Sequence, residues 1–306
     1  MIQGDREWIK SMHGLRGEVV ENAPLAPYSW FRTGGAADVL FTPVDEDDLA
    51  TFLKSLPFDV PLLIIGLGSN LLIRDGGFRG AALRLGKGFT HINVEKPLRL
   101  HVGAGAADVK VARAAAEAGI AGLSFLRGIP GTIGGALRMN GGAYGGEVKD
   151  VLIEARALDR QGNTHTLKHK DMAFTYRHCG ANEELIFTDA VFEGIEGDPA
   201  TILTQMSEIT QARSATQPVN TRTGGSTFKN PDGHKAWELI DQAGCRGLRI
   251  GDAQVSELHC NFLINHGSAT AHDIETLGDE VRKRVLETSG IALHWEIKRV
   301  GEFLTA

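Results

Sequence analysis

Short apolar runs separated by turn residues indicate alternating strands and helices over the first two thirds of the chain. Strands are expected at five of these apolar runs, at 37–42, 62–65, 98–102, 151–158 and 185–193. Helices are expected at 44–56, which opens with acidic residues, and at 107–118, which meets a glycine stop at Gly119. The turn sequence DRQGN at 159–163 predicts a hairpin onto a further strand at 164–167.

A shift in composition at 194–199 marks the start of a second pattern, which is typical of an α+β unit and runs to about Leu293. Pro199 suits the first turn of a helix, and Thr270 with Asp273 forms a capping-box signature. Helices are expected at 199–213, 234–243 and 271–288, and strands at 261–264 and 293–301. The chain is therefore expected to contain two regions of different architecture.

Composition and charge exclude several classes of protein. The 306 residues are 42% hydrophobic and 23% charged, as in ordinary globular chains, and the formal net charge of −6 gives no general reason to bind nucleic acid or acidic lipid. Cys179, Cys245 and Cys260 are too few and too scattered for a disulfide framework or a metal knuckle. The charged N-terminal residues 1–14 are unlike a signal peptide, and no apolar run is long enough to span a membrane. A cytoplasmic protein is expected.

Glycine is unusually frequent, with 38 residues, and is concentrated between 128 and 146. There the chain reads GIPGTIGGA and, after a short spacer, NGGAYGG. Glycine lets backbone N–H groups approach a ligand closely, and Thr132 and Asn140 can add directed hydrogen bonds. We interpret this stretch as a cofactor-binding loop; the alternative is a tight turn in which the glycines only pack.

A second glycine motif, GLGSN at 66–70, follows the strand expected at 62–65. It differs from a dinucleotide-binding fingerprint because Leu71 stands at the third glycine position and the following residues are typical of a strand. No ribose-binding acid follows about 20 residues later. A turn whose successive N–H groups bind an anion is the better interpretation.

Two polar segments carry candidate chemistry. Arg177 lies in a polar segment between strands, where it is either a functional cation or a surface one. The loop RTGGSTFKNP at 222–231 presents Ser226, Lys229 and Asn230, a mixture that suits an anionic or phosphorylated substrate, although a simple turn is also possible. The loop lacks the nucleophile elbow of a hydrolase.

Two further groups have ordinary structural interpretations. Glu296 shares the face of the strand expected at 293–301 with Lys298, so an ion pair between them is one interpretation. His165 and His169 are four positions apart in the expected hairpin, but no carboxylate motif accompanies them. No metal site is predicted.

Taken in order, these segments resemble the UDP-N-acetylenolpyruvoylglucosamine reductases, the flavoenzymes that complete UDP-N-acetylmuramate for bacterial peptidoglycan. The likeness covers the chain from about residue 20 to 303. It rests on collinear motifs at 33–37, 68–72 with Asp75, 128–135, 139–140 with 142–145, 176–177, 217–218, 225–231, Ser256 with His259, and Glu296. Because the motifs are collinear, chance similarity is improbable.

The resemblance implies an α+β fold in two parts. A FAD-binding domain of the vanillyl-alcohol-oxidase type, with two α/β subdomains, is expected at 1–197 and is completed by the C-terminal tail at 294–306. A substrate-binding domain is expected at 198–293. The TQP sequence at 216–218, which precedes the loop at 222–231, is similar to that of the shorter branch of the family. A monomer is expected.

The resemblance also implies the chemistry. NADPH would reduce a non-covalently bound FAD, leave, and be replaced by the enolpyruvyl ether of a UDP-sugar. Arg177 and Glu296 match the residues that stabilise the substrate carboxylate as charge develops on it, and Ser226 matches the proton donor. The expected FAD-binding residues are Gly66, Gly68, Ser69, Asn70, Gly131, Thr132, Gly134, Gly135 and Asn140. The expected substrate-binding residues are Tyr176, Lys229, Asn230 and His259.

The chain departs from the family pattern at Gly141, at Cys179 and at His294-Trp295, where an acidic residue and a proline more usually precede Glu296.

Two other functions are considered. A flavin oxidase of the same fold would share the glycine loops but not Ser226 with Glu296, and it often attaches FAD through a His or Cys that the glycine loops here lack. A non-catalytic nucleotide-sugar-binding protein would not need to retain the three catalytic candidates.

Overall fold

The computed structural model describes residues 7–95 and 97–304. Expectations for residues 1–6, part of the N-terminal segment, and for 305–306 at the end of the tail lie outside the described residues. Contacts divide the chain into two compact units. Unit 1 contains residues up to Glu21, Val39–Leu67 and Gly80–Ala212, and unit 2 contains Asn22–Asp38, Gly68–Arg79 and the residues from Arg213 onward. Both units mix helices with strands, and the α+β class is confirmed.

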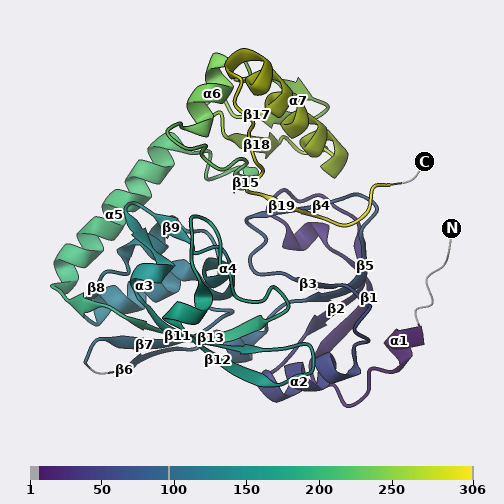
Figure 1. Ribbon diagram of the computed structural model, residues 1–306, viewed down its shortest axis with the longest axis vertical. Helices are drawn as coiled ribbons and strands as arrows, with labels where there is room; N and C mark the ends of the chain where they lie inside the picture. Colours follow the sequence, from purple (N-terminus) through teal and green to yellow (C-terminus); the bar gives the residue numbers. More distant parts are fainter. Residues whose placement is uncertain (1–6, 96, 305–306) are drawn as a thin grey trace. The chain divides into compact units, whose positions relative to one another are not determined.

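The centre of unit 1 is a five-stranded antiparallel sheet in the order β12-β11-β13-β7-β6 (Figure 1). Its strands are β6 (Ile92–Glu95), β7 (Arg99–Gly103), β11 (Leu152–Leu158), β12 (Thr164–Lys168) and β13 (Ile186–Glu193). The expected hairpin is confirmed, because β11 and β12 pair with Leu158 opposite Thr164. Alternate side chains of β7, β11 and β13 enter one core, as expected for a sheet with one covered face.

Helices cover that face of the sheet (Figure 1). They are α3 (Asp108–Glu117), α4 (Ile133–Arg138) and the 3₁₀ segment Ser124–Gly128. In α3 the apolar residues Val111, Ala112 and Ala115 are buried, at the spacing of one helix face. The helix ends as expected at Gly119, whose φ of 71° is the left-handed conformation that glycine adopts without strain.

The N-terminal strands form a second sheet in the order β1-β2-β5-β3. These strands are β1 (Glu18–Pro24), β2 (Ala36–Thr42), β3 (Leu62–Ile64) and β5 (Phe78–Leu83), and the boundaries between the units fall within β1, β2 and β5. Helix α2 (Glu46–Ser55) follows β2, and Asp45 caps it by accepting a hydrogen bond from the Asp48 N–H at 3.0 Å. The acidic helix start is therefore confirmed.

Several short elements complete unit 1. They are α1 (Glu7–Lys10), the strand pair β8 (Ile120–Ala121) and β14 (Ile195–Glu196), and the strand pair β9 (Gly142–Ala143) and β10 (Gly146–Glu147). Further 3₁₀ turns lie at Lys87–Phe89, Val148–Asp150 and His169–Met172. Helix α5 (Pro199–Thr216) begins at the expected proline and runs a little beyond the expected end at Arg213.

Unit 2 contains a four-stranded antiparallel sheet in the order β15-β18-β17-β16, packed with two helices. The elements are β15 (Arg222–Ser226), β16 (Arg249–Ile250), β17 (Ala253–Val255), β18 (Phe262–Asn265), α6 (Ala236–Gln242), α7 (Ala271–Ser289) and a 3₁₀ turn at Ala26–Tyr28. The capping box at Thr270 and Asp273 is confirmed. Asp75 adds a long-range cap, because its carboxylate accepts the N–H groups of Ala271 and His272, both at 2.9 Å.

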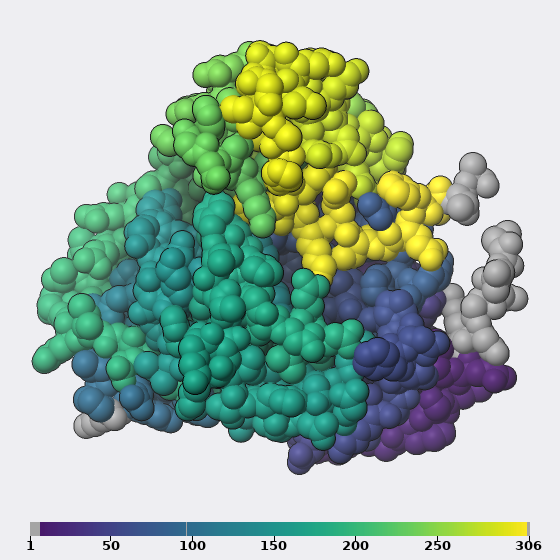
Figure 2. All heavy atoms as spheres, viewed as in Figure 1, coloured from purple at the N-terminus to yellow at the C-terminus, as the bar shows by residue number. Residues whose placement is uncertain are grey.

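The C-terminal tail returns to the segment that follows the GLGSN motif. Strand β19 (Lys298–Val300) pairs in parallel with β4 (Leu71–Ile73), and the C-terminal residues form a continuous yellow surface in the space-filling view (Figure 2). The strand expected at 293–301 is wrong in length. The Glu296 N–H donates to the Thr227 carbonyl at 2.8 Å, so the chain bends there before β19 begins. Glu296 is therefore not part of a strand shared with Lys298.

No helix among the residues 7–95 and 97–304 has both the length and the apolar content needed to cross a membrane.

Candidate active site

The glycine-rich stretch of unit 1 runs beside the segment that leads from β7 into α3. The N–H groups of Asp108, Ile133 and Gly134 donate to the carbonyls of Gly131, Ala106 and Ala104 at 3.1, 3.0 and 2.8 Å. Space is tight, because a Cβ on Gly131 would lie 2.8 Å from Asp108 Oδ2 and one on Gly134 would lie 3.2 Å from the Ala104 oxygen. Glycine is therefore needed for packing at both positions.

Other glycines of the same stretch have an open face. A Cβ on Gly135 would meet only Thr132 Oγ1, at 3.8 Å, and one on Gly145 would meet nothing within 4 Å. Both interpretations of this stretch, tight packing and ligand binding, therefore have support at different glycines. Gly131 and Gly134 are closely packed, whereas Gly135 and Gly145 have open space where a side chain would lie.

The GLGSN motif presents a row of backbone donors. Across the described part of the chain, the hydrogen bonds include no protein acceptor for the N–H groups of residues 66–70. Gly68 has a φ of 69° and packs so closely on the Tyr28 carbonyl that a Cβ would overlap it. On the unit 1 side of the motif, a Cβ on Gly66 would lie 2.7 Å from Thr132 Oγ1. Consecutive unpaired N–H groups suit an anion such as a diphosphate.

Asp108, at the start of α3, is a buried acid behind this loop. The residue is fully buried, and neither carboxyl oxygen has a hydrogen-bond partner in the structure. Burial raises the pKa of the Asp108 carboxyl well above its usual range, because the charged form would be far from water. The acid next to Gly131 therefore holds its proton more tightly than an exposed carboxyl group does.

Arg177 is held at a tight turn by Asn140. The turn closes through two backbone hydrogen bonds between Thr175 and His178, and it gives Arg177 a φ of 53°, which is uncommon for a residue with a side chain. The Asn140 side chain is buried, donates to the Thr175 carbonyl at 3.1 Å and to Glu147 Oε2 at 3.0 Å, and accepts the Lys149 N–H at 3.0 Å. We call Asn140, Glu147, Thr175 and Arg177 the Arg177 cluster.

The guanidinium of Arg177 lies beside the glycine loop. A Cβ on Gly142 would be 3.4 Å from Arg177 Nη1, and the Tyr176 ring is 5.4 Å from the guanidinium carbon. A hydrogen bond from Lys149, with the charge of Arg177 as a smaller cause, lowers the pKa of Glu147, so the cluster carries a permanent carboxylate. The Asn140 side chain makes its hydrogen bonds to other residues of the protein. This residue would therefore contribute to ligand binding by holding the surrounding chain in place.

A second group of predicted residues meets in unit 2. Ser226 is the last residue of β15 and lies opposite Phe262 of β18. The next residue, Thr227, accepts the Glu296 N–H at 2.8 Å, and Asn70 Nδ2 donates to the Glu296 carbonyl at 3.1 Å. A Cβ on Gly225 would meet only the Ser69 carbonyl, at 3.8 Å. We call Asn70, Ser226, Thr227 and Glu296 the Ser226 cluster; Ser226 and Glu296 are both half-buried.

Trp295 holds the chain beside Glu296 in place. Its ring packs 5.1 Å from the Phe228 ring, and Trp295 Nε1 donates to Asp279 Oδ1 at 3.3 Å. The ring covers Gly278 of α7 so closely that a Cβ there would overlap it. The departure from the family pattern at Trp295 is thus matched by a glycine on the facing helix.

The substrate-side candidates of unit 2 surround the same loop. The Lys229 N–H donates to the His294 carbonyl at 2.9 Å, and Asn230 Oδ1 accepts the Ala236 N–H at 2.9 Å at the start of α6. The His259 ring makes a tilted contact with Trp237 and an edge-to-face contact with Phe262, with ring centroids 6.2 and 4.8 Å apart. Burial lowers the pKa of His259.

The structural roles of four residues were not predicted from the sequence: Asp75, Asp108, Asn261 and Gly278. Asn261 holds Phe228 through both amide atoms, at 2.9 and 2.8 Å, and thereby supports the loop after Ser226. Only Asp108 had a local signal, because it was visible as the acidic start of a helix. The other three act on segments far away in the sequence.

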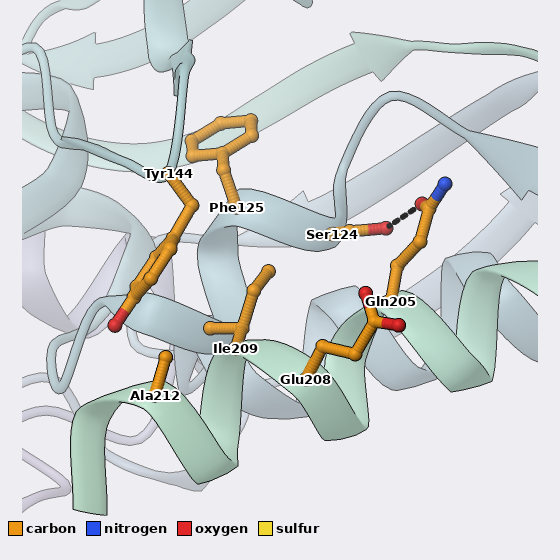
Figure 3. Close-up of a pocket in the computed structure, with 7 residues that line it drawn as sticks. All are labelled: Ser124, Phe125, Tyr144, Gln205, Glu208, Ile209 and Ala212. Atoms are coloured by element: carbon orange, nitrogen blue, oxygen red, sulfur yellow. Dashed lines mark hydrogen bonds between the residues drawn. The ribbon is translucent and has the colours of Figure 1, made fainter. Parts of the chain in front are cut away.

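Figure 3 shows a pocket of about 450 Å³ within unit 1. It is lined by Ser124, Phe125, Tyr144, Gln205, Glu208, Ile209 and Ala212. The Ser124 hydroxyl and Gln205 Oε1 lie 3.4 Å apart across it. None of the predicted site residues lines this pocket, so we assign it no part in the proposed reaction.

Two family models match this chain. A family model described as "FAD binding domain" matches residues 37–168, and one described as "UDP-N-acetylenolpyruvoylglucosamine reductase, C-terminal domain" matches residues 217–300. The UDP-N-acetylenolpyruvoylglucosamine reductase of Parvibaculum lavamentivorans is 64% identical over 287 residues, which are 94% of this chain and 92% of that protein. This chain belongs to the UDP-N-acetylenolpyruvoylglucosamine reductase family.

Other members of this reductase family give the same result. The reductase of Azorhizobium caulinodans is 63% identical, over 94% of this chain and 93% of that protein. The crystal structure of the reductase from Thermus caldophilus matches with a TM-score of 0.80 at 33% identity, and it covers 93% of this chain and 99% of that one. As a member of the reductase family, the chain is a FAD-dependent oxidoreductase, and the predicted flavoprotein fold is confirmed.

Proposed function

We propose that this chain catalyses the NADPH-dependent reduction of the enolpyruvyl ether of UDP-N-acetylglucosamine to UDP-N-acetylmuramate, a step in peptidoglycan precursor synthesis. Family membership carries the FAD-dependent reduction. The observation that most supports this substrate is that Glu296 is bonded to the residue after Ser226, because the Thr227 carbonyl accepts the Glu296 N–H at 2.8 Å. A flavin oxidase acting on a sugar or an alcohol would have no use for this pair.

The two glycine motifs fit the FAD. We propose that Gly66, Gly68, Ser69 and Asn70 bind its diphosphate, because the N–H groups of this turn have no protein acceptor among the hydrogen bonds of the described chain. The proposed partners from the other motif are Gly131, Thr132, Gly134, Gly135 and Asn140. Asp108, whose carboxyl pKa is raised by burial, lies behind Gly131. The chemistry that bound FAD supplies is hydride transfer from NADPH to the terminal vinyl carbon of the substrate.

The reduction also needs stabilisation of the developing negative charge on the enolpyruvyl carboxylate. Arg177 can meet a carboxylate with two parallel N–H donors, and the turn at Thr175–His178 holds it in a fixed orientation. We propose that Glu296 assists at the same carboxylate. Ser226 would then give a proton to the carbon adjacent to the one that receives hydride, so that two hydrogens are added across the double bond.

The rest of the substrate is proposed to contact Tyr176, Lys229, Asn230 and His259. Lys229 offers a cation for the nucleotide diphosphate. Because Asn230 Oδ1 already accepts the Ala236 N–H, the amide nitrogen of Asn230 is the atom left to donate to a phosphate oxygen. We further propose a FAD-binding domain at 1–197 completed by 294–306, a substrate-binding domain at 198–293, a monomeric state and a cytoplasmic location.

An anaerobic absorbance experiment on the purified protein tests this function. We expect the flavin bands to bleach on addition of NADPH and to return quickly when the enolpyruvyl UDP-sugar is added. A protein that takes up FAD and is bleached, but is recoloured only by oxygen, would favour the oxidase. A protein that binds the UDP-sugar without any flavin reduction would favour the non-catalytic binding protein.

A further inference from the structure

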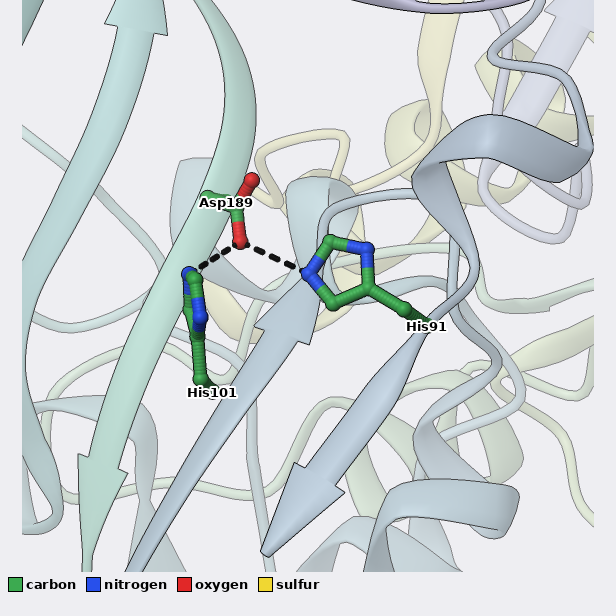
Figure 4. A group of neighbouring side chains, drawn as sticks. All are labelled: His91, His101 and Asp189. Carbon is green, nitrogen blue, oxygen red and sulfur yellow. Dashed lines mark hydrogen bonds and ion pairs between the residues drawn. The ribbon is translucent and has the colours of Figure 1, made fainter. Parts of the chain in front are cut away.

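A group of metal-ligating side chains lies in unit 1, away from both clusters described above. His91, His101 and Asp189 each offer one ligand atom, and these atoms all lie within 4.8 Å of one another. Both imidazoles point their Nε2 atoms at the same oxygen, Asp189 Oδ1, at 3.0 Å from His91 and 2.6 Å from His101 (Figure 4). Two imidazoles and a carboxylate that converge from three directions form a common set of zinc ligands.

The register of the five-stranded sheet places these three side chains next to one another. Asp189 of β13 lies opposite Gly103 of β7, and the Gly103 N–H in turn donates to the His91 carbonyl at 3.0 Å just before β6. His101 is two positions from Gly103 on β7 and so points to the same face of the sheet. A Cβ on Gly103 would lie 3.1 Å from the His91 ring. The glycine therefore leaves the space in which the three side chains meet.

The charges around the group favour a cation. Asp189 uses its second oxygen, Oδ2, to accept from Arg156 at 3.3 Å, and Arg156 is also paired with Glu46 at 2.7 Å. Glu95 Oε1 lies 3.9 Å from His101 Nδ1, the side of the ring where a carboxylate orients a metal-bound imidazole. The three carboxylates of Asp189, Glu46 and Glu95 outnumber the guanidinium groups of Arg156 and of Arg99, which lies opposite Glu95 on the neighbouring strand. Arg156 bonds to Oδ2 of Asp189, and the two imidazoles converge on Oδ1.

The geometry is close to that of a zinc site. Bonds of about 2.0–2.2 Å to a tetrahedral Zn²⁺ separate neighbouring ligand atoms by about 3.3–3.5 Å. The nitrogen–oxygen distances of 3.0 and 2.6 Å would therefore have to open by about 0.3–0.9 Å, which small side-chain rotations can supply. Both imidazoles are one-third exposed, so an ion can enter from solvent and keep a water as its fourth ligand.

We propose that His91, His101 and Asp189 form a binding site for one divalent transition-metal ion of the zinc class. Imidazole ligands favour Zn²⁺ over Mg²⁺ and Ca²⁺, which prefer sites made of oxygen atoms. The site braces the β6-β7-β13 part of the sheet. Two hydrogen bonds also connect the site to the glycine-rich stretch. The Ala104 N–H donates at 2.9 Å to the carbonyl of Thr188, the residue before Asp189, and the Ala104 carbonyl accepts the Gly134 N–H at 2.8 Å.

The chain offers a matched control in the hairpin of β11 and β12. The sequence analysis found no carboxylate for His165, and this is corrected by the structure, in which His165 Nε2 lies 2.7 Å from Asp159 Oδ2. This pair belongs to the same unit and joins one imidazole to one carboxylate, but it lacks the second imidazole. His169 contacts the Lys149 carbonyl instead. A single imidazole–carboxylate pair of this kind is not expected to bind zinc tightly.

The test uses the FAD-loaded protein without a histidine tag, stripped with a chelator and titrated with ZnCl₂ by calorimetry. We expect one ion per chain, a higher unfolding temperature with zinc, and at least about 100-fold weaker binding in each of His91→Ala and His101→Ala. In His165→Ala the affinity should be unchanged. Titration with Co²⁺ should give the visible absorption of a tetrahedral ion in the wild type and in His165→Ala only.

Three results would overturn the proposal. They are the absence of stoichiometric zinc binding in the wild type, tight binding that survives both His91→Ala and His101→Ala, and loss of binding in His165→Ala. His101→Asn keeps a polar side chain of similar size, so it serves as a second variant if His101→Ala does not fold. Retained FAD absorbance and a cooperative unfolding transition in each variant show that the sheet is intact.

Discussion

The Arg177 cluster and the Ser226 cluster are built in opposite ways. All members of the first come from residues 140–177, and the buried Asn140 side chain ties them together over short distances in sequence. The second joins three segments that are far apart in the sequence, around Asn70, Ser226 and Glu296, through one backbone hydrogen bond and one from the Asn70 side chain. The first cluster depends on local turn chemistry, whereas the second depends on the packing of the whole unit around it.

This difference predicts how each cluster can be broken. A substitution in the Arg177 cluster should act on the chemistry and leave the rest of the unit folded. In the Ser226 cluster, even a substitution at the distant residue Gly278 should change the position of Glu296. Helix α7 contacts Trp295 at Gly278, and Trp295 precedes Glu296 in the chain.

The largest effect is expected for Arg177→Lys. A lysine keeps the positive charge but cannot offer two parallel donors to a carboxylate. We expect kcat to fall by about 100- to 1,000-fold, with normal FAD content and an unchanged unfolding temperature. Steady-state kinetics and flavin absorbance measure both.

Arg113→Lys is the control for Arg177→Lys, since Arg113 is exposed on α3 and pairs with Glu117 of the same helix. Near-normal turnover in Arg177→Lys would show that catalysis does not need a bidentate contact from Arg177 to the substrate carboxylate.

Gly278→Ala should destabilise unit 2. An alanine in the middle of a helix normally adds up to about 1 kcal/mol of stability relative to glycine. Here the new methyl group would overlap the Trp295 ring, so we expect a net loss of about 1–3 kcal/mol in the free energy of unfolding. Denaturant unfolding measures this loss, and a lower kcat should accompany it because Glu296 follows Trp295.

Glu287→Ala, at an exposed position of the same helix, is the control for Gly278→Ala. A Gly278→Ala protein that is as stable as the wild type would show that Trp295 moves away freely.

Asp108→Asn should change how stability depends on pH. The native pKa of Asp108 is raised by burial, so the folded protein holds this proton more tightly than the unfolded chain does. The free energy of unfolding should therefore fall as pH rises from the unfolded pKa of about 4 to the native pKa, by about 1.4 kcal/mol for each unit between them. The amide of an asparagine cannot titrate, so the variant should lose this slope and be the more stable protein at alkaline pH.

Thermal unfolding of both proteins across this pH range is the measurement for Asp108→Asn. Parallel pH profiles for the two proteins would mean that Asp108 is ionised in the folded state.

The same difference explains how much the sequence could predict. Helix α7 and the β11–β12 hairpin were predicted because caps and turns are local signals. The glycine stretch was expected to be a loop, but its residues Ile133–Arg138 form helix α4. The contact of Asp75 with the start of α7 was not predictable, since it joins residues nearly 200 positions apart. Glu296 was identified only by family resemblance, and its local structure was predicted wrongly because the Thr227 carbonyl that bends the chain lies on a distant loop.

The central claim is that the Ser226 cluster acts on the sugar substrate and not on the reduction of the flavin. The most direct measurement is anaerobic stopped-flow absorbance on Ser226→Ala, with the two half-reactions followed separately. We predict that NADPH bleaches the flavin at a nearly normal rate, and that the enolpyruvyl UDP-sugar restores the colour at least about 100-fold more slowly than in the wild type. An equal loss of rate in both half-reactions would contradict the account and give Ser226 a purely structural role.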